Sequence, residues 1–274
     1  MEQNPFGGNY ARLIKELEPD CEKCSGLCCV ALYCAKTEGF PADKDAGTPC
    51  RYLAPDFRCG IHADLKDRKM SGCLAYECLG AGQKTTQIYS SVGDWKTAPD
   101  QAEAIFQAFS VLFQLHQILW YLIEAASLTS DEKTAAAVDA LIEENQQMSQ
   151  LPRGSLLETD IAGHKSKANR ILKKIIGSIS SEDPEARQRA DFLGKNFRKA
   201  SLDRKDFSMS LLIAADLEGC SLDRTVFLGA DLRDANLKNT DLSRSVFLTQ
   251  MQINSAKGNR NTRLPAGLRR PSAW

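Results

Sequence analysis

Residues 229–243 read GADLRDANLKNTDLS, in which leucine returns at every fifth position. The same spacing extends in both directions, and the residue at the centre of each five is always leucine or phenylalanine. A helix repeats every 3.6 residues and a strand every two, so neither regular element explains a period of five. Twelve successive positions follow it: Phe192, Phe197, Leu202, Phe207, Leu212, Leu217, Leu222, Phe227, Leu232, Leu237, Leu242 and Phe247.

The side chain two residues before each central position is mostly small, as at Ala215, Ala230 and Ala235, with Lys195 and Lys205 as exceptions. This combination resembles the pentapeptide-repeat family over about residues 190–251. The resemblance implies a right-handed quadrilateral β-helix, in which four pentapeptides make one coil. The central side chains would then fill the interior, and the small side chains would fit the corners.

Each coil of such a solenoid buries its faces only against neighbouring coils, so both ends need covers. We expect a short helix over residues 183–191 to cover the first coil. The tail TRLPAGLRRPSAW, residues 262–274, is the expected cover of the last coil, with Leu264, Leu268 and Trp274 as anchors.

The repeat offers no catalytic constellation, and Cys220 at a small inward position reads as core. Some pentapeptide-repeat proteins mimic DNA, which requires a long acidic rod. Residues 192–256 contain 8 acidic and 9 basic side chains, so the sequence argues against mimicry. An interaction surface for an unidentified protein partner is the simpler prediction.

Nine of the ten cysteines lie between Cys21 and Cys78. A disulfide framework is typical of secreted proteins, but the first twenty residues lack the basic and apolar regions of a signal peptide. Nine is also an odd number of cysteines, so they could not all pair with one another. Cysteines spaced C-x2-C can direct two thiolates at one metal ion. The sequence therefore favours zinc or an iron–sulfur cluster, and spacing alone does not separate the two.

Adjacent side chains usually diverge, so Cys28 and Cys29 suit two ions, or two sides of one cluster, better than one tetrahedral zinc. Four motifs together, CEKCSGLCC from Cys21, PCRYL from Pro49, RCGIH from Arg58 and GCLAYEC from Gly72, resemble the YkgJ-like family of zinc- or iron-chelating domains. The resemblance covers about residues 20–82. It implies metal binding by Cys21, Cys24, Cys28, Cys29, Cys50, Cys59, Cys73 and Cys78.

The chain departs from that family in three places. Cys34 is an extra cysteine, His62 stands where the family tends to have tyrosine, and the segment between Cys59 and Cys73 is longer than usual. Whether Cys34 or His62 also binds the metal stays open at the level of sequence.

Between the two patterned regions the sequence predicts helices over about 98–128, 130–152 and 161–178, preceded by a short one over 10–17. The first is apolar around much of its circumference, but Gln107, Gln114, His116 and Gln117 interrupt it, which argues against a membrane span. A buried helix or a homodimer interface is expected instead. His116 reads as a core or rim histidine, and the lysine-rich face of the third helix as a solvated face.

The sequence thus predicts a multidomain protein with a cysteine-rich zinc- or iron-chelating domain (1–97), an α-helical connector (98–183) and the β-helix with its covers (184–274). Charges balance at 35 basic and 35 acidic residues, and the thiols favour the reducing cytoplasm. A metal-binding protein with an interaction scaffold is the expected function. The alternative is an iron–sulfur or metal-dependent enzyme that modifies a protein or peptide docked on the β-helix, with chemistry supplied by the metal centre.

Overall fold

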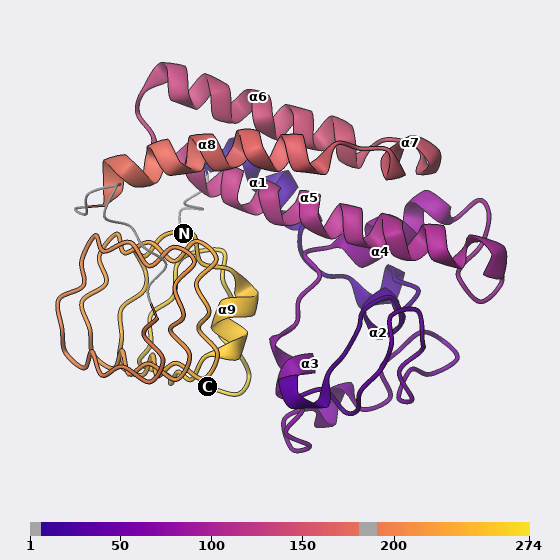
Figure 1. Cartoon of the computed structure of the whole chain (residues 1–274), viewed down its shortest axis with the longest axis horizontal. Coiled ribbons are helices and arrows are strands. Elements are labelled where there is room, and N and C mark those ends of the chain that lie inside the picture. Colours follow the sequence, from indigo (N-terminus) through magenta and orange to yellow (C-terminus); the bar gives the residue numbers. More distant parts are fainter. Residues whose placement is uncertain (1–6, 181–190) are drawn as a thin grey trace. The chain divides into compact units, whose positions relative to one another are not determined.

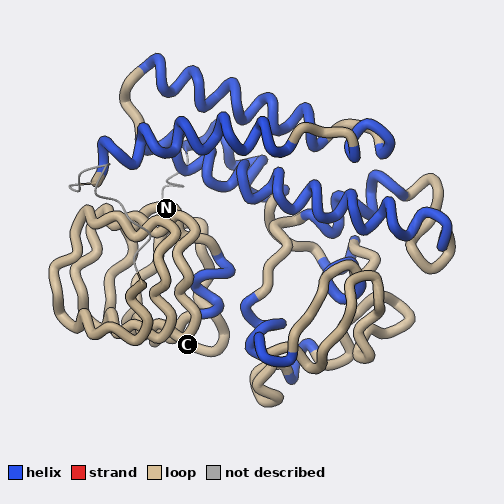
Figure 2. The backbone as a smooth tube through the Cα atoms, in the orientation of Figure 1, coloured by secondary structure: helices blue, strands red, loops and turns tan. Residues whose placement is uncertain are grey.

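The computed structural model describes residues 7–180 and 191–274. These residues divide into two compact units, each considered by itself. The cysteine–helix unit contains residues 7–73 and 77–171, and the repeat unit contains residues 74–76, 172–180 and 191–274. Figure 1 traces the chain through both, and Figure 2 shows helices and loops only.

All the helices expected within the described residues are present, and their bounds are close to those predicted. They are α1 (Gly7–Glu16), α5 (Ala102–Leu128), α6 (Glu132–Ser149) and α8 (Ile161–Ile179). Short helices connect and flank them: α2 (Leu27–Val30), α3 (Ser71–Ala75), α4 (Ala81–Tyr89), α7 (Arg153–Leu157), α9 (Gln250–Ser255) and the 3-10 turns η1 (Cys21–Lys23), η2 (Lys36–Glu38), η3 (His62–Asp64) and η4 (Pro99–Gln101).

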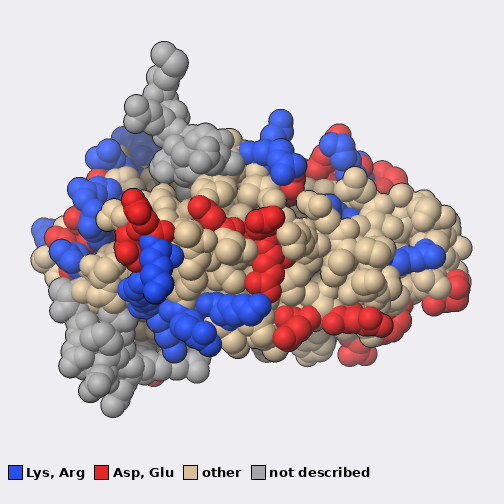
Figure 3. Space-filling model, turned by 90° about the horizontal axis from the view of Figure 1, so that it is seen from above, with Lys and Arg blue, Asp and Glu red and all other residues tan. Residues whose placement is uncertain are grey.

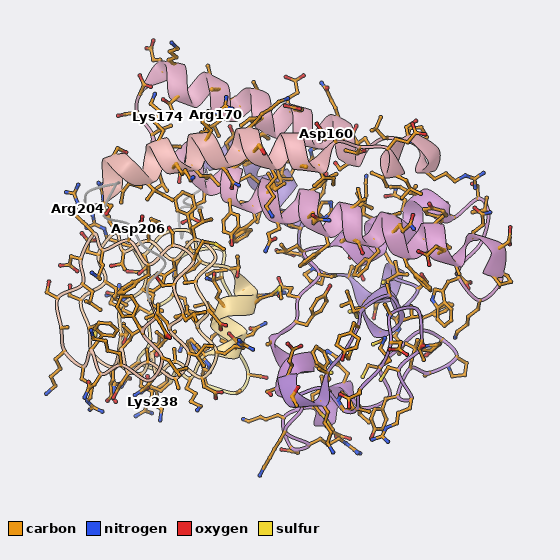
Figure 4. All side chains as sticks on the ribbon, in the orientation of Figure 1. Asp160, Arg170, Lys174, Arg204, Asp206 and Lys238 are labelled. Carbon is orange, nitrogen blue, oxygen red and sulfur yellow. The ribbon has the colours of Figure 1, made fainter. Side chains whose placement is uncertain are left out.

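Helix α5 supplies the largest apolar surface of the cysteine–helix unit. Phe109, Leu112, Leu115 and Leu122 on it are fully buried, and α4 and α6 pack against it. Among the described residues, one stretch, Pro99–Leu128, is long and apolar enough to cross a membrane. An 18-residue window within it has a mean hydropathy of 1.2, and 50% of that window is buried within the protein. The polar face of α8 is exposed, and two of its basic residues, Arg170 and Lys174, are labelled in Figure 4. Figure 3 shows both basic and acidic side chains on the face of the molecule that it presents.

The predicted right-handed quadrilateral β-helix is wrong. Within residues 7–180 and 191–274 the structure contains no β-strand and no sheet. The repeat consists of turns, and single residues twenty positions apart, such as Asp216 and Asn236, form isolated parallel bridges. The reason lies in the corners: residues such as Lys199, Arg204 and Met209 adopt left-handed conformations, with φ of 58°, 59° and 58°. A turn at every fifth residue leaves too little extended backbone for a strand.

Main-chain hydrogen bonds nevertheless hold successive coils of the repeat together. The amide of Leu212 donates to the carbonyl of Asp231 at 2.9 Å, while the amide of Asp231 donates to Ser210 at 2.9 Å. Within most pentapeptides the central carbonyl accepts a turn hydrogen bond, as the carbonyl of Phe207 does from the amide of Ser210 at 3.0 Å. Aspartate or asparagine before the central residue accepts from an amide two residues on, as Asp206 does from Ser208 at 2.9 Å.

The interior of the repeat follows the sequence pattern. Phe207, Phe227 and Phe247 are fully buried, and the rings of Phe207 and Phe227 stack with centroids 5.7 Å apart. The tail behaves as expected, because Leu264, Leu268 and Trp274 all pack against this core. The helix expected over 183–191 falls on residues 183–190, which lie outside the described residues.

Small inward side chains carry a second row of hydrogen bonds. Thr225, Thr240 and Ser245 each donate a hydroxyl to a carbonyl 23 residues earlier, at 2.9, 2.9 and 3.0 Å. The Cys220 thiol occupies an equivalent place and donates to the carbonyl of Phe197 at 2.8 Å. Cys220 is buried in this core, as the sequence predicted.

Two further buried histidines lie in the cysteine–helix unit. His116 on α5 is 6% exposed, and its Nδ1 lies 2.6 Å from the carbonyl of Leu79, so Nδ1 carries the proton. On α8, Nε2 of His164 lies 3.1 Å from the amide nitrogen of Asn145, which also donates to the carbonyl of Leu115 at 3.0 Å. His164 therefore accepts at Nε2 and is protonated at Nδ1.

The first prediction concerns the hydroxyl row. Thr225→Val keeps the shape of this fully buried side chain but removes the hydroxyl donor to the carbonyl of Leu202, which keeps only its turn hydrogen bond from the amide of Lys205 at 3.1 Å. We expect the free energy of unfolding to fall by about 0.5–1.5 kcal/mol in chemical denaturation. Thr225→Ser, which keeps the hydroxyl, should lose less, and equal losses in both variants would contradict this role.

The second prediction concerns pH. Burial lowers the pKa of His116 from 6.5 to about 4. Folding therefore favours the neutral ring, so the stabilisation is complete above pH 6.5 and is lost as the pH falls from 6.5 towards 4. Over that range, acid should cost about 3 kcal/mol through this group.

The measurement is the free energy of unfolding at several pH values for the wild type and for His116→Gln, which keeps a donor for Leu79 and does not titrate. We expect a flatter pH dependence in the variant. Parallel curves for the two proteins would show that His116 does not contribute.

Candidate functional site

The nine clustered cysteines all lie in the cysteine–helix unit. Cys21 begins η1 and Cys24 follows it, while Cys28 and Cys29 belong to α2. Gly26 adopts φ 71° directly before α2, and an added Cβ there would lie 2.9 Å from the Leu53 side chain. This glycine lets the chain turn sharply between the first two cysteines and the adjacent pair.

Main-chain pairing brings the later cysteines towards the first group. The amide of Cys50 donates to the carbonyl of Cys29 at 2.8 Å. Cys34 pairs with Lys44 and Cys59 with Leu53 through antiparallel bridges. Cys73 lies within α3, and Cys78 accepts at its carbonyl from the amide of Ala81 at the start of α4.

Cys24 and Cys78 meet at the beginning of α4. A Cβ on Gly82 would lie 2.6 Å from Sγ of Cys24 and 3.8 Å from Sγ of Cys78. Burial raises the pKa of Cys78 to about 11, while hydrogen bonds from the amides of Gly82 and Gly80 lower it. Because Gly82 has no side chain, the sulfur atoms of Cys24 and Cys78 can both approach the N-terminus of α4.

Cys28 and Cys29 place their Sγ atoms 3.9 Å apart, closer than the divergence of adjacent side chains suggested. Their shared hydrogen bond raises the pKa of Cys28 and lowers that of Cys29. Around a tetrahedral zinc with Zn–S bonds of about 2.3 Å, sulfur atoms stand about 3.8 Å apart, so this pair also suits a single ion.

Burial and neighbouring thiols act together on the other side of the cluster. Burial raises the pKa of Cys73 to about 12, with further increases from Cys29 and Cys50. Burial also raises the pKa of Cys59 and of Cys34, and Cys34 is only 7% exposed. His62, the other residue that the sequence left open as a ligand, is exposed at the start of η3.

These side chains do not form a ready-made metal site. Within residues 7–180 and 191–274, no group of three or more His, Cys, Asp or Glu side chains is arranged to hold a metal ion. The chemistry of the donor set fits a metal that prefers sulfur, since all nine cysteines are free thiols within one unit. The spacing of Cys28 and Cys29 and the room beside Gly82 agree with that chemistry.

Two residues near the thiols were not found from the sequence. Gly82 is one of several glycines in the region, and its role depends on the approach of Cys24 from a distant segment. Lys44 lies beside two of the cysteines: its side chain donates to the carbonyl of Val30, the residue after Cys29, and its main chain pairs with Cys34. Neither residue belongs to a recognisable motif.

Comparison with known proteins identifies a relative that covers most of the chain. The Bacillus subtilis (strain 168) protein named "Uncharacterized protein YybG" is 41% identical over 279 residues, covering 94% of this chain and 95% of that protein. The chain belongs to the YybG family. A family model for pentapeptide repeats, in 8 copies, matches residues 210–247. No solved structure matches the chain.

The family model confirms the pentapeptide repeat but covers the repeat alone. The resemblance of the cysteine-rich segment to YkgJ-like domains is not shown by a family model. The case for a metal site in the cysteine segment therefore rests on the thiols of this chain and the residues around them.

The third prediction tests the room beside Gly82. Alanine usually stabilises a helix interior relative to glycine by about 1 kcal/mol, but at position 82 its Cβ would collide with Sγ of Cys24. We expect Gly82→Ala to lower the melting temperature. Gly177→Ala on α8, where an added Cβ meets nothing within 4 Å, should raise it or leave it unchanged. A stabilised Gly82→Ala protein would contradict this packing.

Proposed function

We propose that the protein binds zinc or an iron–sulfur cluster through the cysteine segment and uses its pentapeptide repeat as an interaction scaffold in the cytoplasm. The observation that carries the proposal is the gathering of nine free thiols from residues 21–78 in one unit. The candidate ligands are those drawn from the sequence: Cys21, Cys24, Cys28, Cys29, Cys50, Cys59, Cys73 and Cys78.

The local structure of the segment supports a stabilising role for a metal. Its main chain consists of short helical turns and isolated bridges, and large parts of it are partly exposed. A segment with so small an apolar core gains stability from a bound metal. When bound, zinc would supply a cross-link, whereas an iron–sulfur cluster would add electron transfer.

The thiols themselves must release protons to bind a metal, because the thiolate is the ligand. The hydrogen bond that Cys29 shares with Cys28 and the charge of Lys44 lower the pKa of Cys29, which favours its thiolate. Cys24 and Cys78 have amide donors near their sulfur atoms, which favour the thiolate against the effect of burial.

The proposed scaffold role rests on the outer surface of the repeat. Ion pairs connect neighbouring coils, as Arg198 does with Asp216 at 3.4 Å and with Glu218 at 3.1 Å. Arg204, labelled in Figure 4, donates to the carbonyl of Ile179 at 2.8 Å and so ties the end of α8 to the repeat. Such a surface is stiff and mixed in charge, which suits a protein partner better than nucleic acid.

The fourth prediction tests metal binding directly. Protein purified without oxygen should contain metal in elemental analysis, either zinc without colour or iron with sulfide and visible absorption. Cys28→Ser should reduce the metal content and the melting temperature, because it removes a ligand from the adjacent pair. Removal of the metal by a chelator should lower the melting temperature of the wild type but have less effect on the variant.

Cys220→Ser is the matched control, since it changes the one cysteine outside the segment and keeps a donor for the carbonyl of Phe197. Its metal content should equal that of the wild type. A wild-type protein without metal after anaerobic purification, and after incubation with Zn²⁺ or ferrous iron and sulfide, would overturn the proposed function.

A further inference from the structure

Lys44 is held in an unusual way beside the thiols. Its main chain pairs with Cys34, donating to the carbonyl at 2.9 Å and accepting from the amide at 3.0 Å. Its side chain turns back into the same loop, where Nζ donates to the carbonyls of Val30 and Asp45, both at 3.2 Å, and of Leu32. An ammonium group has three donors, and here all three have main-chain partners.

Among residues 7–180 and 191–274, no aspartate or glutamate forms an ion pair with the ammonium group of Lys44, and the Asp45 contact is made by its main-chain carbonyl. The side chain is partly buried. Its contacts place the charge beside two cysteines, because Val30 directly follows Cys29 and the main chain of Lys44 pairs with Cys34.

The three carbonyls also explain what the lysine does to the backbone. Val30 ends α2 directly after Cys29, and Leu32 lies two residues before Cys34. A cation that binds both carbonyls fixes the turn that separates these two cysteines. The same cation reaches Asp45 on the returning chain, so it closes the loop from Val30 to Asp45.

We propose that Lys44 is a positioning residue of the cysteine site, which closes the 30–45 loop and supplies a fixed positive charge next to the ligand Cys29. This inference rests on the proposed metal binding. Four thiolates around one divalent ion leave two excess negative charges, and burying excess charge is costly unless a counter-charge is close. Partners of this kind, outside the ligands themselves, typically change metal affinity 10- to 100-fold.

The positive charge at position 44 has to be carried by a small group such as an ammonium. The three carbonyls surround a single nitrogen atom, which matches an ammonium group. A guanidinium group keeps the charge but spreads its donors in a plane, so arginine should restore only part of the function. Methionine keeps most of the apolar stem and loses both the charge and the hydrogen bonds.

The experiment measures Zn²⁺ affinity of the full-length protein by competition with a chromophoric chelator, with the melting temperature of the metal-free protein recorded alongside. Lys44→Met should bind Zn²⁺ about 10- to 100-fold more weakly than the wild type, and Lys44→Arg should fall between them. Lys96→Met is the matched control. Lys96 lies in the same unit, donates to the carbonyl of Pro55 at 3.2 Å and lies 4.2 Å from the ring centroid of Phe57, so its loss also removes a charge and a main-chain hydrogen bond.

The outcomes separate the two proposals. Equal Zn²⁺ affinities for the wild type and Lys44→Met would overturn the role of Lys44 and leave metal binding intact. A loss in Lys96→Met as large as that in Lys44→Met would also overturn it, because the effect would then be one of general stability. A Lys44→Arg protein as weak as Lys44→Met would contradict the contribution of charge. A wild type that binds no metal would overturn the proposed function itself.

Discussion

The hydrogen bonds between coils of the repeat are the interaction on which the C-terminal third of the chain depends. Each coil offers its amides and carbonyls to the next, as Leu212 and Asp231 do, and a five-residue period keeps these groups in register. The register in turn aligns Phe207 over Phe227 inside the coil and places Thr225 against the carbonyl of Leu202. A side chain of the wrong size at an inward position would therefore disturb both the apolar column and the backbone that carries it.

A different constraint governs the cysteine–helix unit, where buried polar contacts connect the cysteine segment to the helices. His116 on the long helix α5 contacts the carbonyl of Leu79, the residue after Cys78. Trp95 donates from its indole nitrogen to the carbonyl of Ser25, between Cys24 and Cys28, at 2.8 Å. The thiols thus stand on segments that the apolar helical core holds from outside, and the positions of Cys24 and Cys78 depend on residues distant in sequence.

Much of this organisation could be predicted from the sequence, because periodicity reports which side chains face inward. The helices were predicted from apolar residues at helical spacing, and the repeat from leucine and phenylalanine at every fifth position. The β-structure was wrong because those side chains do not reveal the backbone angles of Lys199 or Arg204, whose left-handed turns interrupt any strand. In the candidate site the cysteines were conspicuous, but Lys44 and Gly82 were not, since contacts to main-chain carbonyls and an absent Cβ leave no pattern in a sequence.

The bridges between residues twenty positions apart have a consequence for how the repeat can change in length. Loss or gain of one pentapeptide would preserve every inward position, yet it would rotate all that follows by a quarter turn about the axis of the coil. Helix α9 would then leave a group outside the repeat that it contacts, the carbonyl of Ala75, which accepts from the side-chain amide of Asn254 at 3.5 Å. Only a gain or loss of four pentapeptides would return the C-terminal cover to the same side, so the repeat is free to evolve in whole coils and constrained against smaller steps.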